Sequence, residues 1–145
     1  MLPDSIQLIV VTPERQILHE TVVEVTVPGL HGELGILPGH APLITELGIG
    51  ELNYRTSSGG QSVPLTILGG FAEVLPSRVT ILAETAERVT EIDLERAERA
   101  LDRAQKRLVS NDTNLDWDRA TLALQRSLIR IQVVRKYRGQ PVDVR

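Results

Sequence analysis

The 145-residue sequence contains no cysteine, and aromatic residues make up only 3% of it. Without thiols the chain forms neither disulfide bonds nor thiolate metal sites, and a reducing compartment is compatible with it. With so few aromatic side chains, a core has to be built mainly from Val, Ile, Leu and Ala. No stretch approaches the roughly 20 apolar residues that a membrane-spanning helix needs. The N-terminus also lacks a basic region followed by an apolar run, so we expect no secretory signal and expect membrane association only through a partner.

The patterns of common catalytic and metal sites are also missing. The chain has no P-loop, no Gly-x-Ser-x-Gly and no His-Glu-x-x-His. Its serines stand in predicted turns or helices without a paired histidine, so no activated nucleophile is expected. His31 and His40 flank a glycine-rich segment in which only Glu33 is another ligand type, and this set is incomplete for a metal site. We therefore expect no catalytic residues, no metal and no enzyme activity of the chain itself.

Charged residues are unevenly distributed around a net charge of −3. Residues 1–83 carry three Arg against eight Asp and Glu, a net of −5, whereas residues 84–145 carry 13 basic against 11 acidic residues, a net of +2. No acid occurs between Arg119 and Val142. This asymmetry indicates two units with different neighbours. Because no aromatic-rich basic face accompanies it, we expect no binding to nucleic acid.

Short β-branched segments bounded by Gly, Pro and Ser run through the first half of the chain. Alternating apolar and polar residues are typical of strands buried on one face, and the turn residues between them predict their ends. Strands are expected at residues 6–11, 21–27, 42–47, 51–56, 63–68, 71–75 and 78–82. Many short strands at close spacing are typical of a sandwich or barrel.

The second half of the chain changes to helical spacing. Apolar residues recur at intervals of three and four, which predicts two helices with coiled-coil-type stripes separated by a polar break at residues 110–114. The first stripe, over residues 94–108, consists of Leu94, Ala97, Leu101, Ala104 and Leu108. The second, over residues 117–136, consists of Trp117, Ala120, Leu124, Leu128 and Ile131. Thr90 or Asp93 is expected to cap the first helix and Asp116 the second.

These patterns predict the fold class α+β, with an N-terminal all-β sandwich followed by a C-terminal antiparallel two-helix hairpin. The expected domains are residues 1–86 for the sandwich and residues 87–145 for the hairpin with a short C-terminal tail. A polar segment at residues 84–89 is expected to join them.

The second helix carries a further apolar stripe, Leu122, Ile129 and Val133, almost opposite the first. One hairpin seam cannot bury both stripes. Either the extra stripe packs on the β domain, or it serves a partner for part of the time, since exposed apolar stripes mark interaction surfaces.

The most unusual stretch of the sequence lies between residues 32 and 47. Three glycines and two prolines occur within residues 32–42, yet six residues of the stretch are apolar enough to be buried: Leu34, Ile36, Leu37, Leu43, Ile44 and Leu47. A rigid, partly buried loop between short strands satisfies both facts, with Gly35, Pro38 and Gly39 setting its shape through their backbone preferences. His40 is then a loop side chain that hydrogen-bonds the backbone. A tight corner in a β domain explains the composition equally well.

The segment Gly-Glu-Leu-Gly-Ile-Leu-Pro-Gly-His-Ala-Pro-Leu, at residues 32–43, resembles the hallmark segment of the epsilon subunit of F-type ATP synthases, which is the delta subunit in mitochondria. The resemblance extends over nearly the whole chain. It implies a non-catalytic central-stalk rotor subunit of a proton-transporting ATP synthase, bound peripherally at the cytoplasmic face of an energy-transducing membrane. It also implies that the C-terminal hairpin restrains ATP hydrolysis by switching between a compact state and an extended state that inserts into the catalytic headpiece.

The implied partners are the gamma subunit, the membrane ring of c subunits and, through the C-terminal helices, the catalytic beta and alpha subunits. The resemblance places the hallmark segment at the contact with the rotor ring and stalk, with Glu33 facing the polar loops of the ring. The residues that carry this contact are Gly32, Glu33, Leu34, Gly35, Pro38, Gly39 and His40.

A second motif, Ile-Asp-Leu-Glu-Arg-Ala at residues 92–97, resembles the Ile/Leu-Asp-x-x-Arg-Ala motif of bacterial epsilon subunits that bind ATP. A regulatory ATP site would use Asp93, Arg96, Arg103, Arg126 and Arg130, since guanidinium groups offer a planar fork of donors to phosphates. The alternative is that these arginines are solvated or paired with nearby acids in weak ion pairs. No other cofactor is expected.

Two other classes of function compete with the rotor subunit. A free-standing β-sandwich module that binds a ligand is compatible with the first half of the chain, and an enzyme would need a constellation that the sequence lacks. Co-purification separates these classes, because a rotor subunit travels with a much larger headpiece.

Overall fold

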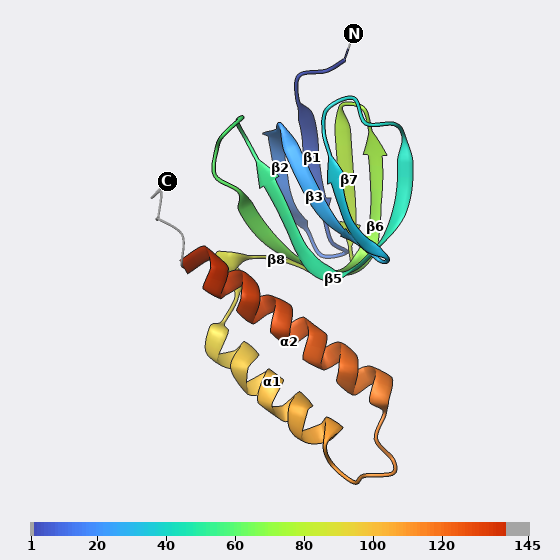
Figure 1. The fold of residues 1–145 in the computed structure, drawn as a ribbon, viewed down its shortest axis with the longest axis vertical. Coiled ribbons are helices and arrows are strands. Elements are labelled where there is room, and N and C mark those ends of the chain that lie inside the picture. Colours follow the sequence, from blue (N-terminus) through green and yellow to red (C-terminus); the bar gives the residue numbers. More distant parts are fainter. Residues whose placement is uncertain (1, 139–145) are drawn as a thin grey trace. The chain divides into compact units, whose positions relative to one another are not determined.

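The computed structural model describes residues 2–138, which divide into two compact units, residues 2–88 and 89–138. The first unit consists of eight strands: β1 (Ile6–Val11), β2 (Gln16–Val22), β3 (Glu24–Gly29), β4 (Gly32–Ile36), β5 (Leu43–Arg55), β6 (Val63–Leu75), β7 (Arg78–Ala83) and β8 (Ala86–Arg88). The second consists of η1 (Val89–Glu91), α1 (Leu94–Leu108) and α2 (Trp117–Arg138). The α+β class with a β-sandwich followed by a helical hairpin is thus confirmed (Figure 1). The expected C-terminal tail at residues 139–145 lies outside the described residues.

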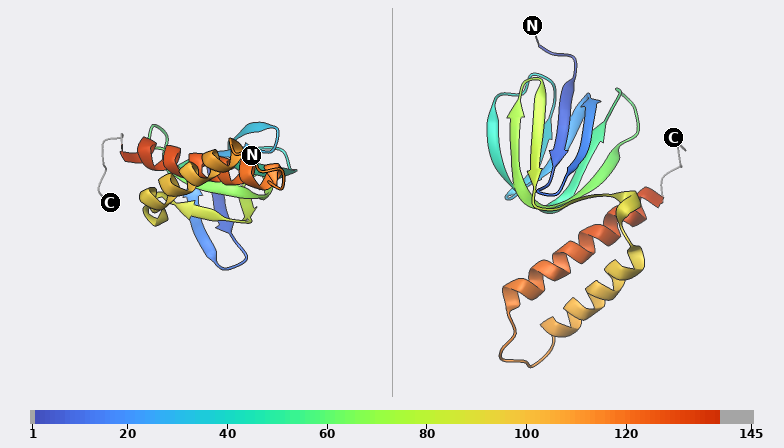
Figure 2. Two further views of the ribbon diagram at one scale, coloured as in Figure 1. Left: turned by 90° about the horizontal axis from the view of Figure 1, so that it is seen from below. Right: turned by 180° about the vertical axis from the view of Figure 1, so that it is seen from behind.

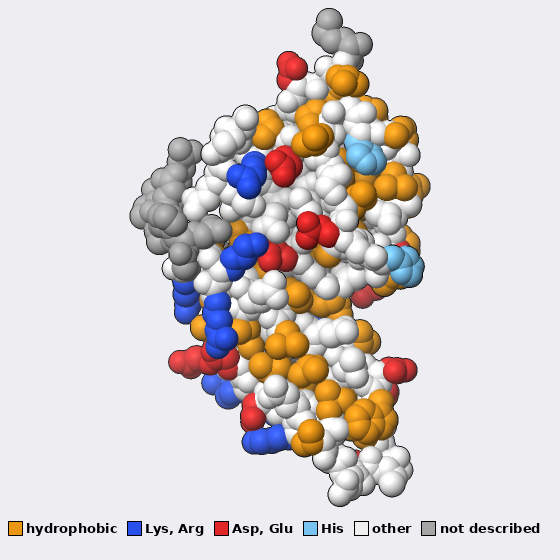
Figure 3. Space-filling model, viewed as in Figure 1, with side chains coloured by type: hydrophobic (Ala, Val, Ile, Leu, Met, Phe, Trp, Pro, Cys, Tyr) orange, Lys and Arg blue, Asp and Glu red, His pale blue; other side chains and the backbone are white. Residues whose placement is uncertain are grey.

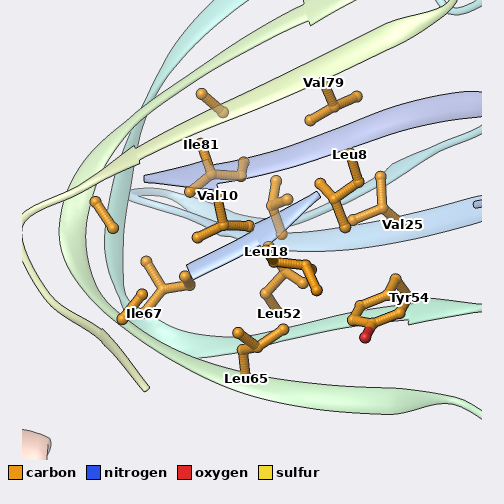
Figure 4. Packing of buried hydrophobic residues seen from close by; sticks show 14 of the residues in the cluster. Leu8, Val10, Leu18, Val25, Leu52, Tyr54, Leu65, Ile67, Val79 and Ile81 are labelled. Carbon is orange, nitrogen blue, oxygen red and sulfur yellow. The ribbon is translucent and has the colours of Figure 1, made fainter. Parts of the chain in front are cut away.

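The strands of the first unit follow the order β2-β1-β7-β6-β5-β3-β4, and β8 pairs with β6. β1 and β7 are parallel, and every other ladder between the described strands is antiparallel. β5 and β6 are long and strongly curved, so the sheet bends back over itself into two layers (Figure 2). The apolar side chains between the layers form one core (Figure 4), which includes Leu8, Val10, Leu18, Val25, Leu52, Leu65, Ile67, Val79 and Ile81.

β5 and β6 are each one continuous strand, and the expectation of two shorter strands in each place was wrong. The glycines that were expected to end strands lie inside β5 and β6, at points where another segment of the chain comes close. A Cβ on Gly50 would lie 2.5 Å from the Pro28 Cβ, and a Cβ on Gly70, whose φ is +131°, would overlap the Leu82 carbonyl oxygen. These glycines therefore allow close approach and curvature without ending the strand.

The segment at residues 84–89 is not the polar linker that its composition suggested. Ala86, Glu87 and Arg88 form β8, which pairs with Ile67, Thr66 and Leu65 of β6. Ala86 is buried in the sandwich core and anchors the strand, although its neighbours in sequence are polar. The sandwich unit thus extends to Arg88 and the helical unit begins with η1.

Both helices begin at capped residues. The Asp93 carboxylate accepts a hydrogen bond from the Arg96 amide at 3.1 Å, and the Asp116 carboxylate does the same for the Arg119 amide at 3.1 Å. Each cap satisfies a backbone donor that has no partner inside the helix. Asp93, and not Thr90, is therefore the cap of α1.

The two helices pack along a seam of small and aliphatic side chains. Ala97 and Ala104 are the buried residues of α1, and Ala120, Ser127 and Ile131 are buried on one face of α2. Two members of the expected α2 stripe lie outside this seam, since Leu128 is 45% exposed and Trp117 54% exposed. Ser127 takes the central position because its hydroxyl is satisfied by the Ala123 carbonyl at 2.9 Å, so a small polar residue can be buried where the helices approach closely.

The second apolar stripe of α2 is largely covered within the helical unit. Val133, together with Val134 and Ile92, forms a buried cluster against which Ile129 and Leu94 pack. The segment between η1 and α1 thus covers this part of α2. Leu122, the remaining member of the stripe, is 42% exposed.

Candidate functional site

The hallmark segment begins with a strand and not with a loop. β4 pairs with β3 in a hairpin whose tip is Leu30–His31, with Gly29 opposite Gly32. A side chain on Gly29 would meet the Gly32 carbonyl oxygen at 2.5 Å, and Gly32 has a φ of +145°, so both positions favour glycine. The glycines therefore build the tip of the β3–β4 hairpin, which the alternation rule alone could not predict.

Glu33 lies on this hairpin with its side chain exposed, opposite Pro28 in the ladder. Next in sequence, Leu34 packs against the sandwich core, and Ile36 is fully buried in it. Alternate residues thus anchor the strand and present Glu33 outward. β4 is also the last strand of the sheet path, with β3 as its ladder partner.

A shallow groove of about 310 Å³ runs beside the hairpin tip, between the start of β4 and the start of β5. Glu33 and Glu46 both line it, together with Leu30, Leu34 and Thr45. The Leu30 amide donates to the Glu46 carbonyl oxygen at 2.9 Å, which ties the tip to β5. The sequence analysis did not identify Glu46 and Leu30 as site residues. The available signal was Glu46 itself, an acidic residue within the mostly apolar strand expected at residues 42–47.

The remaining part of the hallmark segment is a tight turn. The His40 amide donates to the Leu37 carbonyl oxygen at 3.1 Å, and Gly39 between them has a φ of +87°. Pro38 followed by such a glycine is the pattern of a type II β-turn. The His40 ring Nδ1 lies 2.7 Å from the Ala41 carbonyl oxygen, which only accepts, so Nδ1 carries the proton. The Gly39 amide donates to the Pro76 carbonyl oxygen at 2.8 Å and fastens the turn to the β6–β7 connection.

Four expectations about this segment were wrong, one for Gly35 and one for each of three apolar residues. Gly35 does not shape the backbone, because its φ is not positive and an added Cβ would meet no atom within 4 Å. Leu37 and Ile44 are not buried, with exposed fractions of 60% and 73%, and Leu43 is 38% exposed. The three exposed apolar residues follow the last buried residue of β4 and precede the first buried residue of β5. They lie at one end of the sandwich, where the opposite layer does not cover them.

The five residues proposed for ATP lie on the helical unit, and the structure brings them together in part. Asp93 is occupied as the α1 cap, and Arg126 and Arg130 lie one turn apart on α2. Arg103 lines a shallow hollow of about 560 Å³ on α1 together with Arg99 and with the acidic residues Glu95, Glu98 and Asp102. Three carboxylates against two guanidinium groups do not favour a phosphate in that hollow.

The Glu98–Arg135 ion pair, at 3.4 Å, marks one side of the hairpin and sets its register. Counting from this pair along antiparallel helices places Arg103 level with Arg130. At 100° per residue, Arg96 and Arg103 lie on the side of the α1 seam away from Glu98, and Arg126 and Arg130 on the side of the α2 seam away from Arg135. The four arginines therefore share one side of the hairpin.

Ion pairs account for other charged residues of α1. Arg99 pairs with Glu95 at 3.9 Å and Lys106 with Asp102 at 2.8 Å, as the i, i+4 spacing predicted. Within residues 2–138, Arg96, Arg103 and Arg126 form no ion pair, whereas Arg130 does have an interaction partner. Figure 3 shows acidic and basic side chains intermixed along one edge of the helical unit, so this edge does not carry charge of a single sign.

Metal-binding clusters and membrane-spanning helices are both absent from the part of the chain that the structure describes. Within residues 2–138, no three His, Asp or Glu side chains gather in an arrangement that could hold a metal ion. Neither α1 nor α2 combines the length and the apolar character of a membrane-spanning helix.

A β-sandwich with an exposed hairpin at the end of its sheet path, followed by an antiparallel helical hairpin, defines a class of two-domain α+β proteins. Residues 5–89 match the family model of the "ATP synthase, Delta/Epsilon chain, beta-sandwich domain", and residues 90–135 match that of the "long alpha-helix domain". The chain therefore belongs to the delta/epsilon family of F-type ATP synthase subunits, whose members are non-catalytic components of the central stalk.

Curated relatives agree with this assignment over their full length. The ATP synthase epsilon chain of Syntrophobacter fumaroxidans is 46% identical over 136 residues, which cover 93% of this chain and 99% of the relative. The ATP synthase epsilon chain of Herpetosiphon aurantiacus is 48% identical over 135 residues, which cover 93% and 98%.

Two solved assemblies contain chains of similar fold. A chain of the Euglena gracilis mitochondrial ATP synthase, in a structure of OSCP, F1 and the c-ring, has a TM-score of 0.77 and 30% identity, covering 88% of this chain and 80% of that one. A chain of the central stalk and c-ring of the Tetrahymena thermophila mitochondrial ATP synthase has a TM-score of 0.52 and 18% identity, covering 90% and 94%, and supports the fold alone.

Proposed function

We propose that the chain couples rotation of the membrane ring to the catalytic headpiece of an F-type ATP synthase, as the epsilon-type subunit of its rotor. The observation that carries this proposal is the similarity to epsilon chains across both units and nearly the full length of each relative. A free-standing β-sandwich that binds a ligand would need only the first unit, so it accounts for less of the chain. The partners are the gamma subunit and the ring of c subunits, reached from the cytoplasmic side of the membrane.

The β3–β4 hairpin and its groove are the proposed contact with the ring and stalk. Glu33 is exposed and held on a strand whose alternate residues are anchored in the core, so its position is well determined. The groove combines the carboxylates of Glu33 and Glu46 with the apolar side chain of Leu30, which suits polar loops with some apolar contact. The turn at Pro38, Gly39 and His40 presents the adjoining end of the sandwich, with Leu37 exposed beside it.

Reversing the charge of Glu33 tests this contact. Glu33→Arg should leave the isolated fold intact and lower ATP-driven proton pumping in membranes reconstituted with the variant, because one exposed charge of a polar contact is reversed. Glu14→Arg, in an exposed turn elsewhere on the sandwich, is the matched control and should pump as the unchanged chain does. Pumping that is equal in both variants would remove Glu33 from the contact.

We further infer that the helical unit restrains ATP hydrolysis. α2 and its surroundings carry an acid-free basic stretch that needs an acidic surface on a partner, and the catalytic subunits are the proposed partner. This basic set consists of Arg119, Arg126, Arg130, Arg135, Lys136 and Arg138. Removing residues 91–145 from the assembled complex should raise hydrolysis and leave coupling largely intact, since the sandwich keeps its own core. Equal hydrolysis with and without these residues over a range of ATP concentrations would reject the inhibitory role.

A regulatory ATP site on the hairpin is a second proposal, supported by the four arginines that share one side of it. Arg96, Arg103 and Arg126 form no ion pair within the described residues, so their guanidinium groups are available to phosphates. Bound ATP would stabilise the compact hairpin by mass action, because separating the helices dismantles the site. Asp93 would contribute through its cap, which fixes the start of α1 beside Arg96.

Calorimetric titration of the full chain with ATP tests this second proposal. Arg103→Ala and Arg126→Ala should weaken binding, whereas Arg135→Ala, on the other side of the hairpin, should not. No heat at millimolar ATP, or equal binding by all the variants, would leave these arginines as surface charges.

A further inference from the structure

β8 is the shortest strand of the sandwich and the last segment before the helical unit. Its three residues pair with β6, and Val89 follows directly as the first residue of the next unit. The point at which this strand detaches from the sandwich therefore determines how much chain is free between the two units. Besides the ladder with β6, Arg88 and Glu87 each have a side-chain contact within the sandwich unit.

The first contact depends on an irregularity in β2. In the β1–β2 ladder, Val10 pairs with Leu18 and Val11 pairs with Gln16, which leaves Ile17 without a partner residue. This is the arrangement of a β-bulge, in which one extra residue on one strand interrupts the regular ladder. The bulge turns two successive side chains inward, since Ile17 and Leu18 are both buried. It also takes the Ile17 carbonyl group out of the regular ladder.

The Arg88 guanidinium donates a hydrogen bond to that carbonyl group. Its Nη2 donates to the Ile17 carbonyl oxygen at 2.6 Å, joining residues that are 71 positions apart in sequence. A donor that carries charge makes a stronger hydrogen bond than a neutral one. The bond connects β8 to β2, which lies at one end of the sheet path and has no ladder with β8.

The second contact involves the neighbouring residue of β8. Thr66, a fully buried polar residue, has its hydroxyl 3.2 Å from the Glu87 Oε1 and 3.4 Å from the Glu87 carbonyl oxygen. Before these residues, Ala86 is buried in the core, and the Leu68 amide donates to the Thr85 carbonyl oxygen at 2.9 Å. Ala86 is thus held by apolar burial, whereas Glu87 and Arg88 are held by the ladder with β6 and by polar side-chain contacts.

We propose that the bond between Arg88 and the bulged Ile17 is a latch that holds the end of β8 on the sandwich, so that Val89 of the helical unit follows it directly, and that the latch thereby sets the start of any linker between the units. When the latch opens, Glu87 and Arg88 form a linker of up to about 7 Å, at the roughly 3.5 Å per residue of an extended chain. Ala86 remains in the core and limits the change to these two residues. The latch acts on the reach of the helical unit and does not depend on whether that unit inhibits hydrolysis.

Amide hydrogen exchange of the purified full chain tests the first half of this proposal. In Arg88→Ala, peptides covering residues 85–88 should exchange about tenfold faster or more, since a hydrogen bond to a charged group shifts a local opening equilibrium by about one to two orders of magnitude. Thr66→Val, which keeps the buried volume and removes the hydroxyl, should accelerate the same peptides to a smaller extent. Arg78→Ala is the matched control, because Arg78 forms only an exposed ion pair with Glu73 at 3.9 Å, and residues 85–88 should exchange at their original rate. Unchanged exchange of residues 85–88 in Arg88→Ala, or an equal acceleration across β1 and β7, would overturn the latch.

Distance measurements between spin labels test the second half. Because the chain has no cysteine, Ser58→Cys and Gln105→Cys, both at exposed positions, place one label on each unit. Adding Arg88→Ala to this pair should broaden the distance distribution, while a pair at Ser58→Cys and Ser77→Cys, both on the sandwich, should keep its distribution. Faster exchange of residues 85–88 without a broader distribution between the units, or a broader distribution within the sandwich, would overturn the proposal that the latch sets the start of the linker.

Discussion

Two glycines of the hallmark segment are expected to respond to the same substitution in opposite ways. Gly35 lies in β4 with an ordinary negative-φ backbone and with open space where a Cβ would be. Gly39 lies in the turn after β4 with a φ of +87°, and a Cβ there would lie 2.7 Å from the Leu2 Cδ2. The exposed side chain of Leu2 can move aside, so the cost at Gly39 comes mainly from the backbone.

The magnitudes follow from these two environments. Gly35→Ala should leave the free energy of unfolding unchanged or raise it by about 0.4–1 kcal/mol, because alanine reduces the conformational freedom of the unfolded chain. Gly39→Ala has the same favourable effect on the unfolded state. In the folded state, however, an alanine in the left-handed conformation costs about 1–2 kcal/mol. The two variants should therefore differ by about 1–2 kcal/mol, and a difference of 1 kcal/mol corresponds to about 4–8 °C in Tm for a domain of 60–100 residues.

Differential scanning calorimetry of the full chain measures this difference in Tm. The expected order of Tm is Gly35→Ala at or above the unchanged chain, and Gly39→Ala several degrees below it. If Gly35→Ala lowers the Tm as far as Gly39→Ala does, the conformation and free space described for Gly35 are wrong. If Gly35→Ala keeps its Tm but lowers coupling in the assembled complex, the glycine serves the partner contact and not the fold.

Three further outcomes are expected. Burial, and then the charge of Glu20, raise the pKa of Tyr54 above 10.0, while Arg88 acts in the opposite direction. The neutral phenol therefore contributes stability that is fully present below pH 10 and is lost as the pH rises through the folded-state pKa. In urea unfolding, Tyr54→Phe should lose less stability between pH 9 and pH 11 than the unchanged chain does. Ile36→Ala should destabilise the sandwich by about 2–5 kcal/mol, since it truncates a fully buried side chain at the end of β4. A change of less than 1 kcal/mol in the free energy of unfolding by urea would contradict the packing. Asp93→Ala should reduce helix stability by about 1 kcal/mol, as measured by circular dichroism at 222 nm, whereas Asp93→Asn should retain the cap, and equal losses in both variants would contradict it.

The helical unit was the part of the fold most directly predictable from sequence. α1 begins and ends at the expected residues, Leu94 and Leu108, because a cap residue, a stripe with period near 3.6 and i, i+4 ion pairs are all local signals. The assignment of residues within the α2 seam was less accurate. Ser127 replaces Leu128 there because the choice depends on how closely α1 approaches, which is a property of the packed pair.

The sandwich shows a different limit. Gly48, Gly50, Gly69 and Gly70 predicted strand breaks, since glycine without context indicates a turn, yet β5 and β6 continue through them. Only the folded structure reveals that Pro28 and Leu82 lie against two of these positions. β8 was missed for a related reason, because its single apolar residue, Ala86, gives no alternation to detect.

The candidate sites divide in the same way. The sequence by itself determined the fold class, the order of the two units, the Asp116 cap of α2 and the hallmark segment with its family, because each depends on residue types at short, regular spacing. Only the tertiary structure decided that Gly35 is free of internal constraint, that Glu33 shares a groove with Glu46, that Arg103 lies among carboxylates, and that Arg88 bonds to the bulged Ile17. Each of these depends on contacts between segments far apart in the chain, and such contacts form only when the sheet curves and the helices pack.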